Sequence, residues 1–155
     1  MTRSIADQIR KITYETFEIT CYMFPLDEWE LEELDIGEEA RPGSGAMVRF
    51  DGASRGGLMI RPNDELLTAI ASNMLGEDET SEEQKEGALC EIANIICGNT
   101  VPIFAKDEEI CYIRPPFIVG KDYDPKVEFD GYLHESIRVF LDEGIADIDI
   151  HYSME

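Results

Sequence analysis

The sequence is poor in basic residues. Its 13 Lys and Arg stand against 34 Asp and Glu, which gives a formal net charge of −21 at pH 7. Proteins neutralise nucleic-acid phosphates and anionic lipid surfaces largely with Lys and Arg. The composition therefore argues against a nucleic-acid partner and against a membrane partner. It favours a soluble protein whose partners present positive groups.

Long apolar runs and a signal sequence are also missing. No uninterrupted apolar stretch approaches the roughly 20 residues that span a bilayer. The first residues, MTRSIADQ, lack the apolar core of a secretory signal. The four cysteines form no C-x-x-C pair: Cys21, Cys90, Cys97 and Cys111. Because these features are typical of reducing compartments, we expect a cytoplasmic protein with free thiols.

Histidine is scarce, and no metal or nucleophile motif is visible. His134 and His151 lie on opposite strands of a predicted terminal hairpin, and the cysteines are distant in sequence. A zinc site would need two more close ligands, and a Cys–His nucleophile is equally unsupported. The glycines at 52, 56 and 57 fit a hairpin turn better than a phosphate-binding loop, since no Lys-Ser/Thr follows. We therefore expect no metal site in this chain.

What the sequence does contain is an alternation of helix and strand patterns. Apolar residues spaced by threes and fours predict a first helix from about Thr2 to Phe24, and Pro25 ends it. The apolar stripe of this helix comprises Ile5, Ile9, Ile12, Ile19 and Met23, with Thr16 filling the gap.

Further predicted elements are strands at 46–50 and 57–61 and a helix that starts near residues 62–65, with Pro62 in its first turn, and runs to Leu75. Overlapping capping boxes, Thr80 with Glu83 and Ser81 with Gln84, predict the start of a helix that reaches about Gly98. A terminal hairpin is predicted at 133–141 and 146–152. This order predicts an α+β architecture.

One stretch is strongly acidic and carries no base. In residues 26–39, Trp29, Leu31 and Leu34 are candidates to anchor an edge strand. A solvated acidic edge is the simpler interpretation, and a binding surface is the alternative. For Thr100 to Glu109 the pattern allows a further short helix.

The segment 87–99, GALCEIANIICGN, carries the most informative pattern. At about 100° per residue, Glu91 and Asn94 lie about 60° apart on one helix face. The same side carries Gln84, Gly87, Ile95 and Gly98. The other side is apolar and comprises Leu89, Ile92, Ala93 and Ile96, with Cys90 and Cys97 on its flank. The pattern predicts a buried side and a presented side, with Glu91 and Asn94 presented.

Two glycines flank this polar pair. A glycine inside a helix lowers its stability by about 1 kcal/mol relative to alanine, so the presence of Gly87 and Gly98 in this helix needs an explanation. One reason is close approach by another backbone to the surface that carries Glu91 and Asn94. The alternative is that Gly87 packs against a neighbouring helix and Gly98 caps the C-terminus.

These residues resemble a known family. Glu91-x-x-Asn94, followed by Ile95-Ile96-x-Gly98-Asn99, resembles the E-x-x-N helix signature of the CheC–CheX–FliY chemotaxis phosphatases. Residues 112–120, YIRPPFIVG, look like the proline-containing segment that follows this helix in the family. Gly87 stands where an acidic residue or serine often occurs one turn before the glutamate, and the interval to Pro116 is slightly short. CheC-like members carry two such helices, whereas one site per chain resembles the CheX branch.

The resemblance implies both a fold and a function. The fold would be one CheX-like domain over residues 1–155, with an antiparallel-rich sheet packed against long helices, and members of the branch pair through their sheets into dimers. The activity would be hydrolysis of the aspartyl phosphate on a CheY-like response regulator. By analogy, Asn94 would orient the attacking water, and Glu91 would bind the regulator's active-site lysine. Gly87, Ile95 and Gly98 would contact the partner, which brings its own Mg²⁺.

Two other functions remain open from the sequence. The first is a non-catalytic module on the same fold that binds a response regulator, with Gly87 marking lost activity. The second is a structural domain in a signalling assembly. A regulator bound without accelerated loss of its phosphate would select the first of these.

Overall fold

The fold is an antiparallel sheet covered by helices. The computed structural model describes residues 4–27, 29–30, 43–104 and 110–153. In chain order, the elements are α1 (Ile5–Cys21), β1 (Gly45–Gly52), β2 (Arg55–Pro62), α3 (Asp64–Leu75), α4 (Glu82–Thr100), the 3-10 helix η2 (Val101–Phe104), β3 (Cys111–Ile113), β4 (Phe117–Val119), α5 (Pro125–Glu128), β5 (Leu133–Leu141) and β6 (Gly144–Ser153). The predicted α+β class is confirmed.

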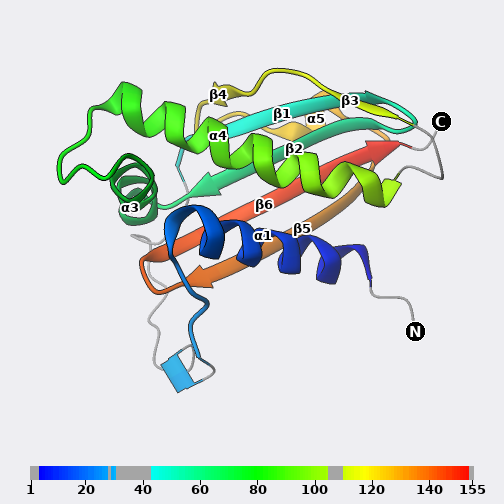
Figure 1. Ribbon diagram of the computed structural model, residues 1–155. Coiled ribbons are helices and arrows are strands. Elements are labelled where there is room, and N and C mark those ends of the chain that lie inside the picture. Colours follow the sequence, from blue (N-terminus) through cyan, green and yellow to red (C-terminus); the bar gives the residue numbers. More distant parts are fainter. Residues whose placement is uncertain (1–3, 28, 31–42, 105–109, 154–155) are drawn as a thin grey trace.

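The sheet has the strand order β3-β1-β2-β6-β5, with β4 also paired to β1. All of its pairings are antiparallel. Helices α1 and α4 lie across one face of the sheet, and α5 lies on the other side (Figure 1). The last strand, β6, therefore sits between β2 and β5 in the middle of the sheet.

Alternating side chains divide the two faces of the sheet. Toward the helices, the strands bury Ala46, Val48 and Phe50 of β1, Leu58 and Ile60 of β2, and Ala146, Ile148 and Ile150 of β6. A smaller cluster on the opposite face contains Met47, Met59, Val119 and Phe129. The predicted strand pairs are confirmed, because alternation with period two places every second side chain in the core.

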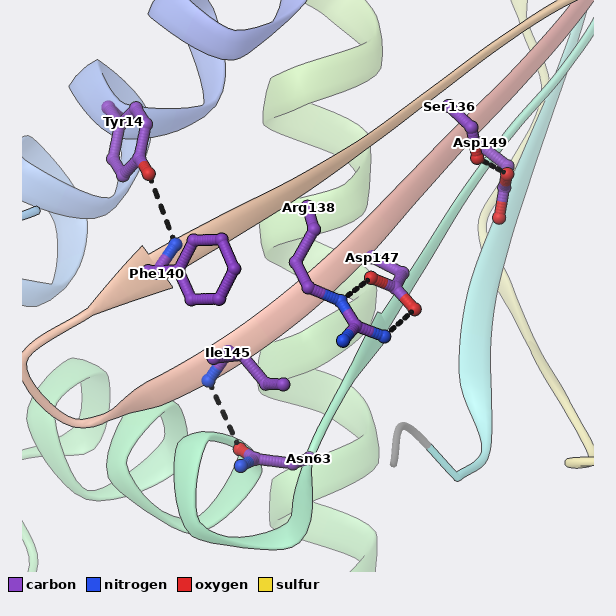
Figure 2. Close-up of polar contacts among 8 residues, drawn as sticks. All are labelled: Tyr14, Asn63, Ser136, Arg138, Phe140, Ile145, Asp147 and Asp149. Carbon is purple, nitrogen blue, oxygen red and sulfur yellow. Dashed lines mark hydrogen bonds and ion pairs between the residues drawn. The ribbon is translucent and has the colours of Figure 1, made fainter. Parts of the chain in front are cut away.

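Polar caps start the two central helices. Ser81 and Gln84 form the predicted capping box at the start of α4, with each side chain bonded to the other residue's backbone N–H. The predicted start of α3 near residues 62–65 is confirmed, because the helix begins at Asp64 with Asn63 as its N-cap. Pro62 does not lie in the first turn as predicted, since it ends β2. The Asn63 side-chain oxygen accepts hydrogen bonds from the N–H groups of Leu66 and Ile145, which ties α3 to β6 (Figure 2).

The first helix is shorter than predicted, and part of its stripe differs. Helix α1 ends at Cys21, because Tyr22 adopts the left-handed conformation before Pro25 is reached. Thr16 is buried as expected, but the prediction for Ile19 is wrong because that side chain is exposed. The buried stripe continues instead through Phe17 and Cys21, and Ile19 lies about 200° around the helix from Phe17.

The acidic stretch after α1 is described only in part. Leu31 and Leu34 lie outside the described residues. Trp29 is described and its side chain is exposed, so the prediction that it anchors an edge strand is wrong. The chain meets the sheet earlier, where Pro25 bridges Leu141 of β5 and the N–H of Leu26 donates to the carbonyl of Phe140.

One helical stretch in the described residues, Glu82–Phe104, is long and apolar enough to cross a membrane by length and composition. It is not the uninterrupted apolar run that the sequence was expected to lack, since it contains Glu82, Lys85 and Glu91. Half of its most apolar window is buried inside the protein. Its apolar residues, among them Ile92 and Ile96, belong to the main core, which is also the pattern of a helix that covers a sheet.

Candidate functional site

Helix α4 has one buried side and one presented side, as predicted. The buried residues are Ala88, Leu89, Ile92, Ala93, Ile96, Cys97 and Thr100. The exposed side carries a row spaced by fours and threes that we call the α4 stripe: Glu83, Gly87, Glu91, Asn94 and Gly98. Ile95 and Gln84 lie half-buried at its margin. The stripe faces away from the sheet and its covering helices.

The polar pair at the centre of the stripe is unengaged. Within the described residues, neither Glu91 nor Asn94 makes a side-chain hydrogen bond or an ion pair. The neighbouring Asn99 differs, because its amide nitrogen donates to the carbonyl of Ile95 at 3.1 Å. The only lysine of the helix, Lys85, pairs with Glu82 instead. The carboxylate and the carboxamide are therefore both available to an external molecule.

The flanking glycines have no internal explanation. A methyl group at Gly87 would meet no atom within 4 Å, so packing against a neighbouring helix is excluded. A methyl group at Gly98 would lie 3.7 Å from Ile113 Cδ1, an ordinary contact. Helix α4 continues to Thr100, so the alternative that Gly98 caps its end is also wrong. The glycines keep the surface low on both sides of Glu91 and Asn94.

Residues 112–120 run beside this helix on the edge of the sheet. Strands β3 and β4 pair with opposite ends of β1, and Arg114–Pro116 joins them. Arg114 anchors the joint, because its N–H donates to the carbonyl of Arg49 and its guanidinium binds the Asp51 carboxylate at 2.7 and 2.9 Å. The prolines interrupt the pairing, since they donate no backbone hydrogen bond. Ile113 contacts the end of α4 that bears Gly98.

The two segments that carry the motifs, residues 87–99 and 112–120, both lie in a region that matches one protein-family model. The family model described as "Chemotaxis phosphatase CheX" matches residues 44–132, which include all of α4 and both β3 and β4. The chain belongs to the CheX family. The match leaves out α1 and the terminal hairpin of β5 and β6, both of which the structure packs onto the matched part. No curated protein matches the chain.

Solved CheX structures share the fold of this CheX-family chain. The chemotaxis protein CheX from Vibrio vulnificus is 19% identical, with a TM-score of 0.73 and 97% of each chain covered. CheX from Desulfovibrio desulfuricans is 14% identical, with a TM-score of 0.74 and 96% and 99% coverage. A complex named CheX–CheY–BeF₃–Mg²⁺ from Borrelia burgdorferi is 17% identical, with a TM-score of 0.69 and 96% and 97% coverage. At these identities the likeness establishes the fold.

Titratable groups also gather on the far face of the sheet, which the sequence did not predict. His134 and His151 are paired across β5 and β6, with ring centroids 4.2 Å apart. His134 Nε2 lies 3.1 Å from Asp149, which also accepts from Ser136 (Figure 2). Burial lowers the pKa of His151, and neither of its ring nitrogens has a hydrogen-bond partner among the described residues.

Metal ligands do not converge in the part of the chain that the structure describes. No group of three or more His, Cys, Asp or Glu side chains there is arranged to hold a metal ion. The stacked histidine rings lie nearly parallel, with 10° between their planes, so their nitrogens do not aim at a common point. Cys97 is buried, and burial raises the pKa of its thiol to about 12. That thiol is therefore a poor nucleophile at neutral pH.

A second polar cluster on the same far face serves packing. Glu128 of α5 binds the Arg49 guanidinium at 2.6 and 2.7 Å and accepts from the Tyr123 hydroxyl. Burial and the Glu128 carboxylate raise the pKa of Tyr123 to about 12, while Arg49 lowers the pKa of Glu128. Arg49 also lies over the Phe117 ring. These contacts fasten the segment after β3 onto β1 and leave the α4 stripe as the candidate site.

Proposed function

We propose that this CheX-family protein is a cytoplasmic phosphatase for the aspartyl phosphate of a CheY-like response regulator. The observation that carries the proposal is the α4 stripe, in which an unengaged glutamate and asparagine stand between two helix-interior glycines. Family membership supports it. So does the Borrelia burgdorferi complex, whose name joins a CheX to CheY. In this proposal residues 1–155 form one domain with one site.

Asn94 is the proposed catalytic residue. Phosphoryl transfer to water requires mainly positioning and charge stabilisation, because its loose transition state needs little covalent help. The Asn94 carboxamide oxygen accepts a hydrogen bond from the attacking water and holds it in line with the phosphorus. A neutral amide suits this place better than a carboxylate, which the anionic phosphoryl group would repel.

Glu91 is the proposed docking residue. It lies one turn before Asn94 on the same face, and its negative charge keeps it from the phosphoryl oxygens. Receiver domains carry a lysine beside the phosphorylated aspartate. A charge-assisted hydrogen bond from this lysine to Glu91 fixes the position of the partner and draws the lysine aside. Gly87, Ile95 and Gly98 then form the low surface that admits the rim of the receiver's active site.

The metal in this reaction belongs to the partner. The Borrelia burgdorferi complex is named with CheY, BeF₃ and Mg²⁺. Mg²⁺ binds carboxylates together with substrate phosphates. In the proposed complex the phosphorylated regulator supplies both, and Asn94 and Glu91 act beside that metal without binding it. The chain needs no cofactor of its own.

A homodimer is part of the proposal. Pairing of two chains through their sheets is what the resemblance to the CheX branch implies, and each protomer would then carry one α4 stripe. Sedimentation velocity at micromolar concentration should give the mass of a dimer. A strict monomer that still removes the phosphate would remove the dimer from the proposal and leave the site unchanged.

The test is the decay of aspartyl phosphate on a cognate regulator, with and without this protein. The wild-type chain should accelerate the decay, and Asn94→Ala should reduce the acceleration by at least about a hundredfold, the scale of losing one positioned catalytic group. Glu86→Ala is the matched control, because it removes an exposed residue from the same helix outside the stripe. No acceleration by the wild type, with binding retained, would instead select a non-catalytic docking module.

A further inference from the structure

An exposed apolar surface lies where two helices end. The amide nitrogen of Asn73 in α3 donates to the carbonyl of Cys21, at the end of α1, and to the carboxylate of Glu143 in the β5–β6 turn. Four exposed large apolar side chains lie within three positions of Cys21 or Asn73 along the sequence: Ile19 (76% exposed), Tyr22 (75%), Phe24 (50%) and Leu75 (46%). We call these four residues the α1–α3 corner. Single exposed apolar residues are ordinary, but a cluster of them marks an interaction surface.

Tyr22 occupies an unusual backbone conformation for its residue type. Its φ of 55° is the only positive φ of a non-glycine residue in the described chain. Glycine and asparagine are the residues that adopt this helix-ending conformation most readily. Within the described residues the Tyr22 hydroxyl has no hydrogen-bond partner, and its ring is exposed. Nothing inside the described chain accounts for a tyrosine at this position.

Lys and Arg are absent from the described stretches that form the corner. These stretches are residues 12–27, 29–30, 62–84 and 139–153. Glu18, Asp142 and Glu143 are exposed beside it. The last turns of α1 and α3 carry no base, so the partial negative charges of both helix C-termini add to these carboxylates.

This combination restricts what can bind. A second copy of the chain would bring the same negative corner and be repelled, and a nucleic acid or an anionic lipid would be repelled for the same reason. A protein segment with apolar residues on one face and Lys or Arg along its edges matches both the apolar side chains and the negative rim. Short amphipathic helices of this kind are a common mode of peptide recognition.

We propose that the α1–α3 corner is a docking surface for a basic amphipathic helix of a partner protein. The apolar face of that helix covers Tyr22, Phe24 and Leu75, and its cations face Glu18, Asp142 and Glu143. The surface uses different helices from the α4 stripe. It stands independently of the proposed phosphatase function.

The proposal can be tested with a fluorescent peptide of leucine and lysine, about 18 residues long, that forms an amphipathic helix. A glycine–lysine peptide with the same number of lysines measures attraction to the overall charge alone. The test variant is Tyr22→Asn with Phe24→Ser, which keeps the charge and gives the left-handed position a favoured residue. The control is Val127→Ser, which removes an equally exposed apolar side chain (78%) from α5 on the other side of the sheet.

The leucine–lysine peptide should bind the wild type and Val127→Ser alike, and at least about tenfold more weakly to the double variant, a loss that corresponds to a few buried apolar groups. Unfolding midpoints of the three proteins show whether the folds are equivalent. Equal binding to all three proteins would overturn the proposal. Equal affinity of the wild type for the two peptides would do so as well, because the apolar corner would then contribute nothing.

Discussion

Glu91 and Asn94 are candidate functional residues because of their setting on α4: they share an exposed face, and their side chains have no partner within the described residues. Their exposure and common face follow from helical periodicity alone, so the sequence predicted this part of the site correctly. The sequence could not show that both side chains are unengaged, because Asn99, five residues after Asn94, is equally polar yet bonds to its own helix. Nor could it show that Gly87 faces open space. Both facts depend on which elements pack beside the helix.

The docking role of Glu91 leads to a prediction about affinity. Glu91→Gln should weaken binding of the phosphorylated regulator about tenfold, because a hydrogen bond between charged groups contributes about 1.5–3 kcal/mol. Isothermal titration or fluorescence anisotropy with a non-hydrolysing phosphate analogue on the regulator would measure this. Glu86→Gln, with the same loss of charge elsewhere on the helix, should change the affinity less than twofold. Equal losses in both variants would reduce the role of Glu91 to general electrostatic attraction.

Gly87 should show opposite effects on stability and on binding. Gly87→Ala should stabilise the protein by about 0.5–1 kcal/mol, because alanine favours the helix and its methyl group meets no neighbour. The same change should weaken regulator binding if the partner approaches closely at this point. Urea unfolding and a binding titration give the two numbers. Unchanged binding would mean that the glycine is not part of the interface.

At the scale of elements, local sequence patterns predicted individual helices and strands well, but they did not predict the contacts between them. The hairpin of β5 and β6, the capping box at Ser81 and the apolar side of α4 all followed from residues close in sequence. The predictions for Ile19 and Trp29 were wrong because an apolar residue at helical or strand spacing is buried only if a neighbouring element covers it. The covering element comes from a distant part of the chain, and local periodicity does not predict which element packs there.

The terminal hairpin should make stability depend on pH. His151 lies buried between the rings of Phe129 and His134, with no hydrogen-bond partner in the part of the chain that the structure describes. Burial is the main cause of its lowered pKa. His134 lowers this pKa further, as Lys126 does, while Asp149 and Asp124 act in the opposite direction. The folded state therefore binds a proton at this site less readily than the unfolded chain.

It follows that His151 contributes stability that is present above the unfolded pKa of about 6.5 and is lost as the pH falls through its lower folded pKa. The dependence should not exceed about 1.4 kcal/mol per pH unit, the value for one proton. His151→Phe should show a weaker loss of stability than the wild type between about pH 7 and pH 5, measured by urea unfolding. An identical slope in the two proteins would assign the acid sensitivity to other groups.

At the scale of the whole molecule, the α+β class was predictable, whereas the order of the strands was not. The order of helix and strand patterns implied the class, but β6 enters the middle of the sheet between β2 and β5 through pairings of residues nearly a hundred positions apart. The net charge of −21 was also evident, although not its distribution. The folded chain brings base-free stretches together at the α1–α3 corner, which composition alone does not reveal.

This net charge should govern how fast the regulator is captured. The association rate constant should fall by about tenfold when the ionic strength rises from about 0.01 M to 0.15 M, because salt screens the attraction between this acidic protein and a proposed basic patch on the regulator. The dissociation rate constant should change much less. Stopped-flow fluorescence at several salt concentrations separates the two. A rate of association independent of salt would show that charge plays no part in the encounter.

The measurement that tests the central claim most directly is phosphate decay at saturating concentrations of each variant. Saturation separates docking from catalysis: Glu91→Gln should recover most of the wild-type decay rate once its weaker binding is overcome, because Asn94 remains in place. Asn94→Ala should bind normally and yet leave the regulator at its intrinsic rate of decay. Full acceleration by saturating Asn94→Ala would contradict the account, since the water would then be positioned by some other group.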